Sequence, residues 1–351
     1  MKGERVIVYL PSDIPLPKNL GHSIELRHTR LGESNLIGRA LWYWLVLSRV
    51  IKREAIDVLF CPGGMLPKIA KSRCKTIVAF RNMLPFAPQE RKRYPLGYVR
   101  ARLLLLKFLQ SRSFKKADHV IFISRFAKSV IDQFLGGKQE GGASVIPHGI
   151  NEAFRSNNVA SPDKKSGDRY VLYVSILDVY KSQLQVVEAW SLLRKMKPDI
   201  EEKLYLVGPE YPAYGAKVRL RIEQLGLQEE VKYLGAASYS QLPKLYREAT
   251  INLFASSCEN CPNILLEALA SGTPILCSNY PPMPEFAGEA VLYFDPYSPH
   301  DAAQKLFKLL VDEDLRGAMA KKALYQSRGY DWRQTANQTW RLLRFYTRGQ
   351  C

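Results

Sequence analysis

Short runs of β-branched and aromatic residues alternate with longer amphipathic stretches along most of this chain of 351 residues. In the first half, strands are predicted at 6–10, 58–60, 76–80, 120–123 and 144–146, with helices at 41–54 and 97–117. Parallel strands joined by crossover helices have this pattern. The alternation therefore predicts an α/β fold built on parallel sheets.

A polar segment rich in turn-forming residues, SNNVASPDKKSGD at 156–168, divides the chain like a linker. A second alternating series follows it. Strands are predicted at 170–174, 203–207, 231–234, 251–254 and 274–277, and helices at 182–196, 216–225, 240–248, 263–270 and 300–312. The sequence thus predicts two doubly wound, Rossmann-like domains that face a central cleft. A ligand is expected in that cleft, at the carboxyl ends of the strands.

The segment 257–272, SCENCPNILLEALASG, carries the strongest chemical signal. It follows a predicted buried strand and opens a helix near Asn263. Free N–H groups and the positive end of the helix dipole suit this helix start to a diphosphate. Glu267 lies one turn into the helix, where a carboxylate accepts hydrogen bonds from a ribose diol. Glu259 precedes the helix, within reach of sugar hydroxyls.

These residues resemble the donor signature of the family 4 retaining glycosyltransferases, which have the GT-B fold. The likeness extends to YVSILDVYKSQLQVVEAW at 173–190, LYLVGPE at 204–210, VKYLGAAS at 231–238 and NYPPMPEFAGEAVLYFDP at 279–296. Within the family, the chain is similar to mannosyl- and rhamnosyl-type transferases of bacterial surface polysaccharide. The resemblance implies a sugar transferred from a nucleotide-diphosphate sugar to a lipid-linked saccharide acceptor.

The resemblance also implies a division of roles. Lys181 binds the diphosphate and stabilises the charge that develops on it, so that no metal and no other cofactor is expected. Glu259 binds the sugar and Glu267 the ribose, while the small Ser175 lets the diphosphate approach. The expected donor-binding set is Ser175, Lys181, Gly208, Glu259, Asn260, Cys261, Asn263, Ile264 and Glu267. The expected catalytic residues are Glu259, Lys181 and Arg81.

The acceptor side departs from the family pattern. In KTIVAFRNMLPF at 75–86, Arg81 and Asn82 stand where many relatives have histidine and aspartate. Arginine stays protonated and cannot act as a base, so Arg81 either grips a phosphate or leaving group or lines the strand end structurally. Ser124 and Arg125 are expected to face the cleft, and His148 to turn the chain toward the linker. No general base stands out in this half.

The formal net charge is +18, and residues 81–130 hold twelve Lys or Arg against two acids. Aromatic and leucine residues are interleaved with these cations. This pattern is typical of a helix in the interface of an anionic membrane, where each cation contributes about 1 kcal/mol. A core-facing helix with a solvated basic face is the alternative. No apolar run is long enough to span a membrane, and no signal peptide is expected. We expect a cytoplasmic protein attached to the inner face of the membrane.

Two short motifs are weaker signals. Cys258 and Cys261 form a C-x-x-C without the second ligand pair that zinc requires. Asp312 and Asp314 form a D-x-D at a polar helix end, where a solvated surface is the simpler interpretation. Neither predicts a metal site.

The C-terminal segment 330–346 is predicted to be an amphipathic helix that returns to the first domain. The predicted domains are therefore 1–160 plus 333–351, for the acceptor, and 161–332, for the donor. Two other functions stay open: a GT-B nucleotide-sugar epimerase or phosphorylase, and a basic nucleic-acid-binding protein, for which no binding motif is present. The sequence leaves the donor sugar and its base, GDP, UDP or dTDP, undetermined.

Overall fold

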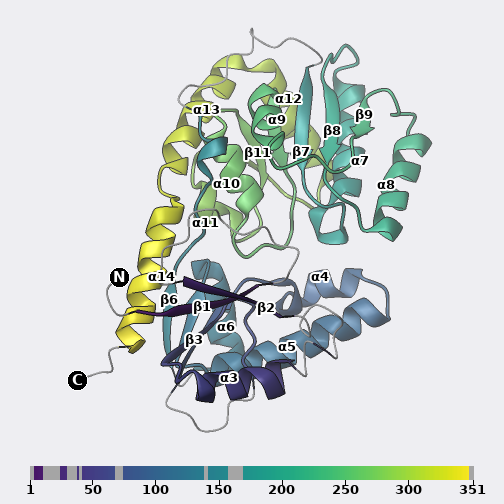
Figure 1. The fold of residues 1–351 in the computed structure, drawn as a ribbon. Helices are drawn as coiled ribbons and strands as arrows, with labels where there is room; N and C mark the ends of the chain where they lie inside the picture. Colours follow the sequence, from purple (N-terminus) through teal and green to yellow (C-terminus); the bar gives the residue numbers. More distant parts are fainter. Residues whose placement is uncertain are drawn as a thin grey trace.

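The computed structural model describes residues 4–10, 24–29, 38, 42–67, 74–137, 141–156 and 169–347. Two lobes are seen, each built around its own parallel sheet, and the chain passes between them twice (Figure 1). The predicted α/β fold with two Rossmann-like domains is confirmed. The predicted linker falls almost wholly outside the described residues.

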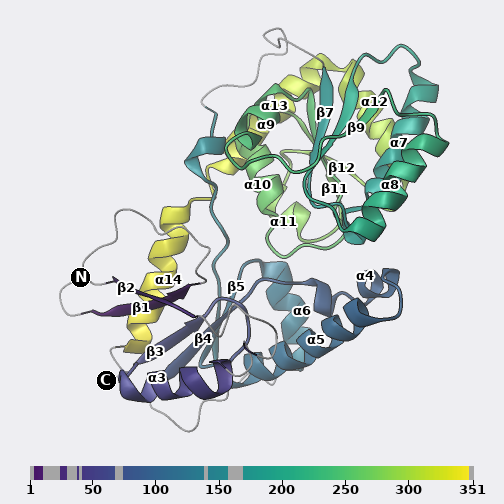
Figure 2. The ribbon, with the colours of Figure 1, turned by 45° about the vertical axis from the view of Figure 1, so that its right-hand side comes forward.

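The first lobe holds a four-stranded parallel sheet in the order β3-β4-β5-β6. Its strands are β3 (Val58–Cys61), β4 (Lys75–Phe80), β5 (His119–Phe122) and β6 (Gly142–Val145). Around it lie α3 (Leu47–Arg53), α4 (Pro88–Arg93), α5 (Tyr98–Lys116) and α6 (Arg125–Leu135). The strands β1 (Val6–Leu10) and β2 (Ile24–His28) pair with each other (Figure 2). The central strands β4 and β5 are buried on both faces, as near-continuous apolar runs in a parallel sheet require.

The second lobe holds six parallel strands in the order β12-β11-β10-β7-β8-β9. They are β7 (Tyr170–Val174), β8 (Lys203–Val207), β9 (Val231–Tyr233), β10 (Ile251–Phe254), β11 (Ile275–Ser278) and β12 (Leu292–Phe294). The chain builds outward from β7 in one direction and from β10 in the other. The boundary between β7 and β10 is therefore a topological switch point, where open α/β sheets bind ligands.

Helices cover both faces of this second sheet. They are α7 (Gln183–Met196), α8 (Pro212–Gln224), α9 (Leu242–Glu248), α10 (Asn263–Ala270), α11 (Met283–Ala287), α12 (Pro299–Val311) and α13 (Glu313–Ser327). Trp190 of α7 is fully buried in one core beside α12, and Leu265 of α10 is buried in the other. Apolar side chains at helical spacing thus fasten α7 and α10 to opposite faces of the sheet.

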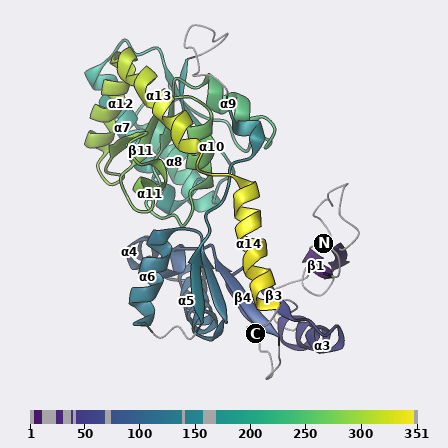
Figure 3. The ribbon, with the colours of Figure 1, turned by 90° about the vertical axis from the view of Figure 1, so that its left-hand side faces the viewer.

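The last helix, α14 (Trp332–Thr347), leaves the second lobe and lies along the first, against β3 and β4 (Figure 3). Arg344 donates to Glu4 at 2.8 Å, and the Tyr346 hydroxyl donates to the carbonyl of Asp118 at 3.0 Å. Both contacts fix the end of this helix on the first lobe. The domain boundaries predicted at 160 and 332 stay a prediction.

The sequence prediction missed several elements. Strands β2 and β12 and helices α4, α6 and α13 were not predicted, and α8 begins four residues earlier than predicted. The missed strands are too short to show a clear hydrophobic period. The helix 88–93 shows none either, because four of its six residues are charged. Short elements of this kind are held by their surroundings rather than by their own pattern.

Candidate functional site

Lys181 and Glu259 meet at the switch point of the second sheet. Lys181 ends a short 3-10 turn, Val179–Lys181, just after β7, and its ammonium forms an ion pair with the Glu259 carboxylate from the loop after β10. The Lys181 side chain is buried, and its Nζ lies 5.0 Å from the ring centre of Tyr180. The parallel strands therefore bring together two charges that are 78 positions apart in sequence.

Small residues follow the neighbouring strands β7 and β8. Gly208, just after β8, has φ +143, and a Cβ there would lie 2.1 Å from the carbonyl oxygen of Ser175. Any larger residue at 208 would push the two strand ends apart. Ser175 is buried, and its hydroxyl accepts from Gln183 Nε2 at 2.8 Å. Two small residues thus let the ends of β7 and β8 pack closely at the place where the resemblance puts a diphosphate.

Helix α10 begins at Asn263, directly after Pro262, as predicted. Its first N–H groups lie beside the Glu259 loop, with Cys261 buried and Ile264 partly buried in the core of that lobe. Glu267 lies on the same helix and accepts from the Tyr246 hydroxyl at 3.3 Å. Burial raises the pKa of Glu267 to about 7, although hydrogen bonds from Tyr246 and Tyr239 oppose that rise. The predicted donor residues are therefore gathered at the carboxyl ends of β7, β8 and β10.

Asn260 and Ser124 join the two lobes. The Asn260 amide donates to the Phe80 carbonyl at 3.0 Å, and its oxygen accepts from the Ser124 hydroxyl at 3.1 Å. Ser124 is fully buried and caps α6 by accepting from the backbone of Ala127. The Ser124 hydroxyl therefore lies at the cleft between the lobes, as expected, and is engaged there by Asn260.

The Glu285 carboxylate completes this cap from the second lobe. Its two oxygens accept from the backbone N–H groups of Arg125 and Phe126, at 2.7 and 2.9 Å. Helix starts leave such N–H groups without partners, and a carboxylate there also complements the helix dipole. The start of α6 is thus satisfied by a residue of the other lobe.

Arg81 and Asn82 follow β4 and are exposed. Arg81 Nη2 lies 3.2 Å from Nε2 of His148, and Asn82 accepts from the backbone of Leu84 at 3.2 Å. Asn82 therefore caps a local turn. Arg81 lies near the donor loop, because its partner His148 also contacts Asn263 at the start of α10.

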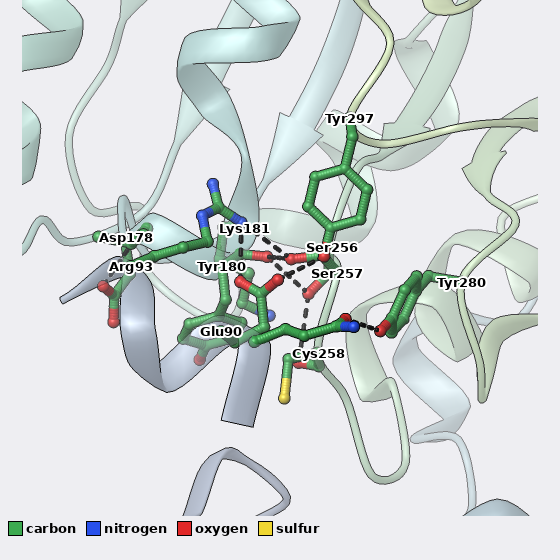
Figure 4. A network of polar contacts seen from close by, with 12 residues as sticks. Glu90, Arg93, Asp178, Tyr180, Lys181, Ser256, Ser257, Cys258, Tyr280 and Tyr297 are labelled. Carbon is green, nitrogen blue, oxygen red and sulfur yellow. Dashed lines mark hydrogen bonds and ion pairs between the residues drawn. The ribbon is translucent and has the colours of Figure 1, made fainter. Parts of the chain in front are cut away.

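A second group of interface contacts centres on α4, which the sequence prediction missed (Figure 4). Glu90 is 1% exposed and accepts from Arg93 at 2.7 Å and from the Tyr297 hydroxyl. Arg93 also donates to Ser257 at 3.2 Å, and the Tyr94 hydroxyl donates to Asp178 at 2.9 Å. This α4 clasp, which we define as Glu90, Arg93 and Tyr94 with Asp178, Ser257 and Tyr297, therefore holds both loops that carry Lys181 and Glu259.

The two weaker motifs have structural roles. Cys258 and Cys261 are buried, and burial raises the pKa of the Cys261 thiol to about 12. Asp312 caps α13 by accepting from the backbone of Leu315 at 2.8 Å. Over the described ranges, no group of three or more His, Cys, Asp or Glu is arranged to hold a metal ion.

Helix α5 and its flanks expose apolar and basic side chains together. We define this basic apolar surface as Leu96, Tyr98, Arg100, Arg102, Leu104, Leu105, Phe108, Arg112, Lys115 and Lys116. Leu96 is 83% exposed and Phe108 64%, while Leu103 and Phe114 of the same helix are buried. None of the helices in the described part of the chain is both long and apolar enough to cross a bilayer. An apolar patch rimmed by cations is typical of an interaction surface.

Two family models together match residues 1–325. The model described as Glycosyltransferase Family 4 matches residues 1–154, and the one described as Glycosyl transferases group 1 matches residues 154–325. The boundary between the two matches falls at Phe154, which follows the last strand of the first sheet and is buried in a core of the second lobe.

Curated relatives match part of their length. The chain is 28% identical over 236 residues to O-antigen chain mannosyltransferase B of Escherichia coli, which covers 65% of this chain and 60% of that protein. It is 30% identical over 174 residues to D-inositol 3-phosphate glycosyltransferase of Corynebacterium glutamicum, which covers 48% of this chain and 42% of that protein. The matches thus span about half the length of these relatives.

Solved structures share the fold over nearly the whole chain. Sucrose-phosphate synthase from Thermosynechococcus elongatus superposes with a TM-score of 0.76 at 16% identity, over 97% of this chain and 89% of that one. WaaG, a glycosyltransferase of lipopolysaccharide biosynthesis, gives 0.72 at 17% identity, over 97% and 91%. Anabaena HepE in complex with UDP and glucose gives 0.66 at 18%, over 91% and 85%. These likenesses show the GT-B arrangement of two lobes.

Proposed function

Since this chain belongs to the family 4 glycosyltransferases, we propose that it transfers a hexosyl-type sugar from a nucleotide-diphosphate sugar to a saccharide acceptor, with retention of configuration. The observation that carries the proposal is the Lys181–Glu259 ion pair at the switch point, beside the start of α10. A cation, a carboxylate and the N–H groups of a helix start are the chemistry that a sugar diphosphate requires.

In this proposal the bond between the sugar and the diphosphate breaks, and the diphosphate takes the electron pair. The Lys181 ammonium and the first N–H groups of α10 stabilise the developing charge. Glu259 holds the sugar hydroxyls and Glu267 the ribose. The acceptor oxygen attacks from the same face, and its proton passes to the departing phosphate oxygen. Arg81 stabilises the leaving group from the first lobe, and no metal ion takes part.

The acceptor is proposed to be lipid-linked and located at an anionic membrane on the cytoplasmic side. Two observations support this. O-antigen mannosyltransferases are among the relatives, and the basic apolar surface presents Leu105 and Phe108 beside Arg102 and Arg112. Apolar burial combined with attraction to anionic lipids is how interfacial helices bind membranes. We place the reaction in the synthesis of bacterial surface polysaccharide.

A thermal-shift screen against GDP, UDP and dTDP and their sugars tests the donor site. We expect one nucleotide to raise the melting temperature, because a ligand that binds the folded state stabilises it by mass action. Lys181→Ala should abolish that shift, whereas Lys195→Ala, an exposed lysine on the following helix, should not. If no nucleotide shifts the wild type, the transferase proposal is wrong.

Retention and independence from metal have separate tests. Proton NMR of the product should show the anomeric configuration of the donor. Activity should survive treatment with EDTA, because Lys181 supplies the positive charge. An inverted product would contradict the proposed geometry, and loss of activity that Mg²⁺ or Mn²⁺ restores would contradict metal independence.

Co-sedimentation with vesicles tests the membrane surface. We expect binding to vesicles with anionic lipids and little binding to neutral ones. Phe108→Asp should weaken this binding about tenfold, because it removes an apolar contact and adds a repelled charge. Leu220→Asp, at a leucine 53% exposed on α8, is the matched control. Equal binding to both lipids would exclude the electrostatic part of the proposal.

A further inference from the structure

His148 contacts three elements from the segment that joins the two lobes. Its Nε2 lies 3.2 Å from Arg81 Nη2 after β4, and its Nδ1 lies 2.9 Å from Asn263 Oδ1 at the start of α10. Its ring stacks on Trp332, the first residue of α14, with centroids 5.1 Å apart and planes at 30°. The imidazole is buried at 8% exposure. One side chain therefore connects the acceptor lobe, the donor helix and the returning helix.

The partners fix the protonation of this imidazole. A guanidinium only donates, so Nε2 must accept from Arg81 with its lone pair. The proton of the neutral ring must then lie on Nδ1, which donates to the Asn263 oxygen. Both ring nitrogens are thus used in one tautomer. A second proton on Nε2 would place two donors against each other and break the contact with Arg81.

The backbone around His148 leaves little freedom for the ring to move. A Cβ on Gly149 would lie 2.0 Å from the backbone nitrogen of Trp332, so the two crossing segments touch there. The Thr335 hydroxyl donates to the carbonyl of Pro147 at 2.7 Å, and Ile150 forms a parallel bridge with Asp331. The two segments that cross between the lobes therefore touch beside His148.

We infer that His148 is a positioning residue that orients the Arg81 guanidinium toward a donor bound on α10. Because His148 contacts both lobes, this orientation depends on the contact between them. The inference rests on the proposed function, which places the diphosphate at the start of α10. His148 itself exchanges no proton in the reaction. Its neutral ring holds Arg81 from one side and Asn263 from the other.

Two substitutions separate the two hydrogen bonds. His148→Asn keeps a donor near the Nδ1 position for Asn263 and loses the acceptor for Arg81. His148→Gln keeps an acceptor near the Nε2 position for Arg81 and loses the donor for Asn263. We expect His148→Asn to lower kcat about a hundredfold, as misplacement of a catalytic group does, with the KM for the donor changed less than threefold. His148→Gln should retain activity within about tenfold of the wild type.

A double-mutant cycle with Arg81→Ala gives the decisive readout. If His148 acts through Arg81, then His148→Asn adds no further loss of kcat in the Arg81→Ala background. Losses that multiply would overturn the inference, and so would wild-type kcat in His148→Asn. If His148→Asn and His148→Gln both lower the melting temperature and abolish nucleotide binding, His148 has only a structural role, and the inference is overturned as well.

Two measurements keep this inference distinct from the proposed function. Nitrogen chemical shifts of labelled histidine, assigned with the His148→Gln variant among the five histidines, report the tautomer without any donor. The N–H is expected on Nδ1, and a proton found on Nε2 would overturn the inference. Failure of the wild type to bind any nucleotide would instead refute the proposed function, whatever the tautomer.

Acid pH provides a further readout. Burial lowers the pKa of His148 below its usual value. The hydrogen bond to Asn263 opposes this shift, and the charge of Arg81 adds a smaller lowering effect. The titratable or charged groups around the ring are Arg81, Cys261, Tyr330 and Asp331. Activity should fall at acid pH, below the usual range of histidine, as the ring gains its second proton, and this fall should be absent in His148→Gln. An unchanged acid profile in that variant would contradict the inference.

Discussion

The two sides of the interface between the lobes are built in different ways. On the donor side, Lys181 and Glu259 stand at the ends of neighbouring parallel strands, so the sheet alone brings them together. On the acceptor side, α4, the start of α6 and His148 reach their partners only when the lobes approach each other. The pairing of Lys181 with Glu259 is therefore set by one sheet, although the α4 clasp also holds their loops, and the contacts of the acceptor side depend on how the lobes meet.

This difference predicts that changes on the donor side affect chemistry, while changes on the acceptor side affect the approach of the lobes. The largest expected effect is Lys181→Ala. Removing a cation aimed at the charge of a transition state costs about a hundredfold to a thousandfold in kcat. Steady-state kinetics with Lys195→Ala as control measures it. A loss under tenfold would show that Lys181 is dispensable and that charge stabilisation comes from elsewhere.

The second prediction concerns the α4 clasp. Glu90→Ala removes a buried carboxylate from Arg93 and Tyr297, which are themselves partly exposed, and should weaken the contact between the lobes by about 1–2 kcal/mol. Fluorescence energy transfer between labels on the two lobes would measure the open fraction.

The control for the clasp is Glu229→Ala. Glu229 is 91% exposed and pairs with Lys232, three residues later, just as Glu90 pairs with Arg93. An exposed pair of this kind contributes less than about 1 kcal/mol. We expect no change in the open fraction for this variant. If Glu90→Ala leaves the lobes equally closed, the clasp does not hold them.

These two regions also show what the sequence can predict. The strand 251–254 and the helix 263–270 have the predicted bounds, and parallel strands converge at one edge of a sheet, so Lys181 and Glu259 could be placed together. Glu90 and Tyr297 are 207 positions apart and belong to different lobes. A charged helix such as 88–93 has the local pattern of a solvent-exposed surface. The burial of Glu90 on this helix depends on how the domains face each other, which no local pattern specifies.

The third prediction uses the titration of Glu267. Its pKa is raised to about 7, so the folded protein binds a proton there more tightly than the unfolded chain does. The protonated carboxyl therefore contributes its whole stabilisation below about pH 4.5, and this contribution is lost as the pH rises through about 7. If the ribose diol binds the ionised carboxylate, nucleotide affinity should rise about tenfold between pH 6 and pH 8, because one proton must leave.

Calorimetric titration of the cognate nucleotide at several pH values would measure this rise. Glu267→Gln should abolish the pH dependence, whereas Glu223→Gln, at an exposed glutamate on α8, should preserve it. A wild-type affinity that stays constant from pH 6 to pH 8 would argue against a ribose contact at Glu267. The donor side is thus tested independently of the approach of the lobes.

The smallest expected effects compare two carboxylates that cap helices. Asp312 caps α13 within its own lobe, and Glu285 caps α6 across the interface. Asp312→Ala should lower the free energy of unfolding by about 1 kcal/mol, as loss of an N-cap does. Glu285→Ala should lower it by less than about 0.5 kcal/mol, because water reaches the start of α6 once the lobes separate. Urea denaturation measures both, and an equal loss for Glu285→Ala would mean that the two lobes unfold as one unit.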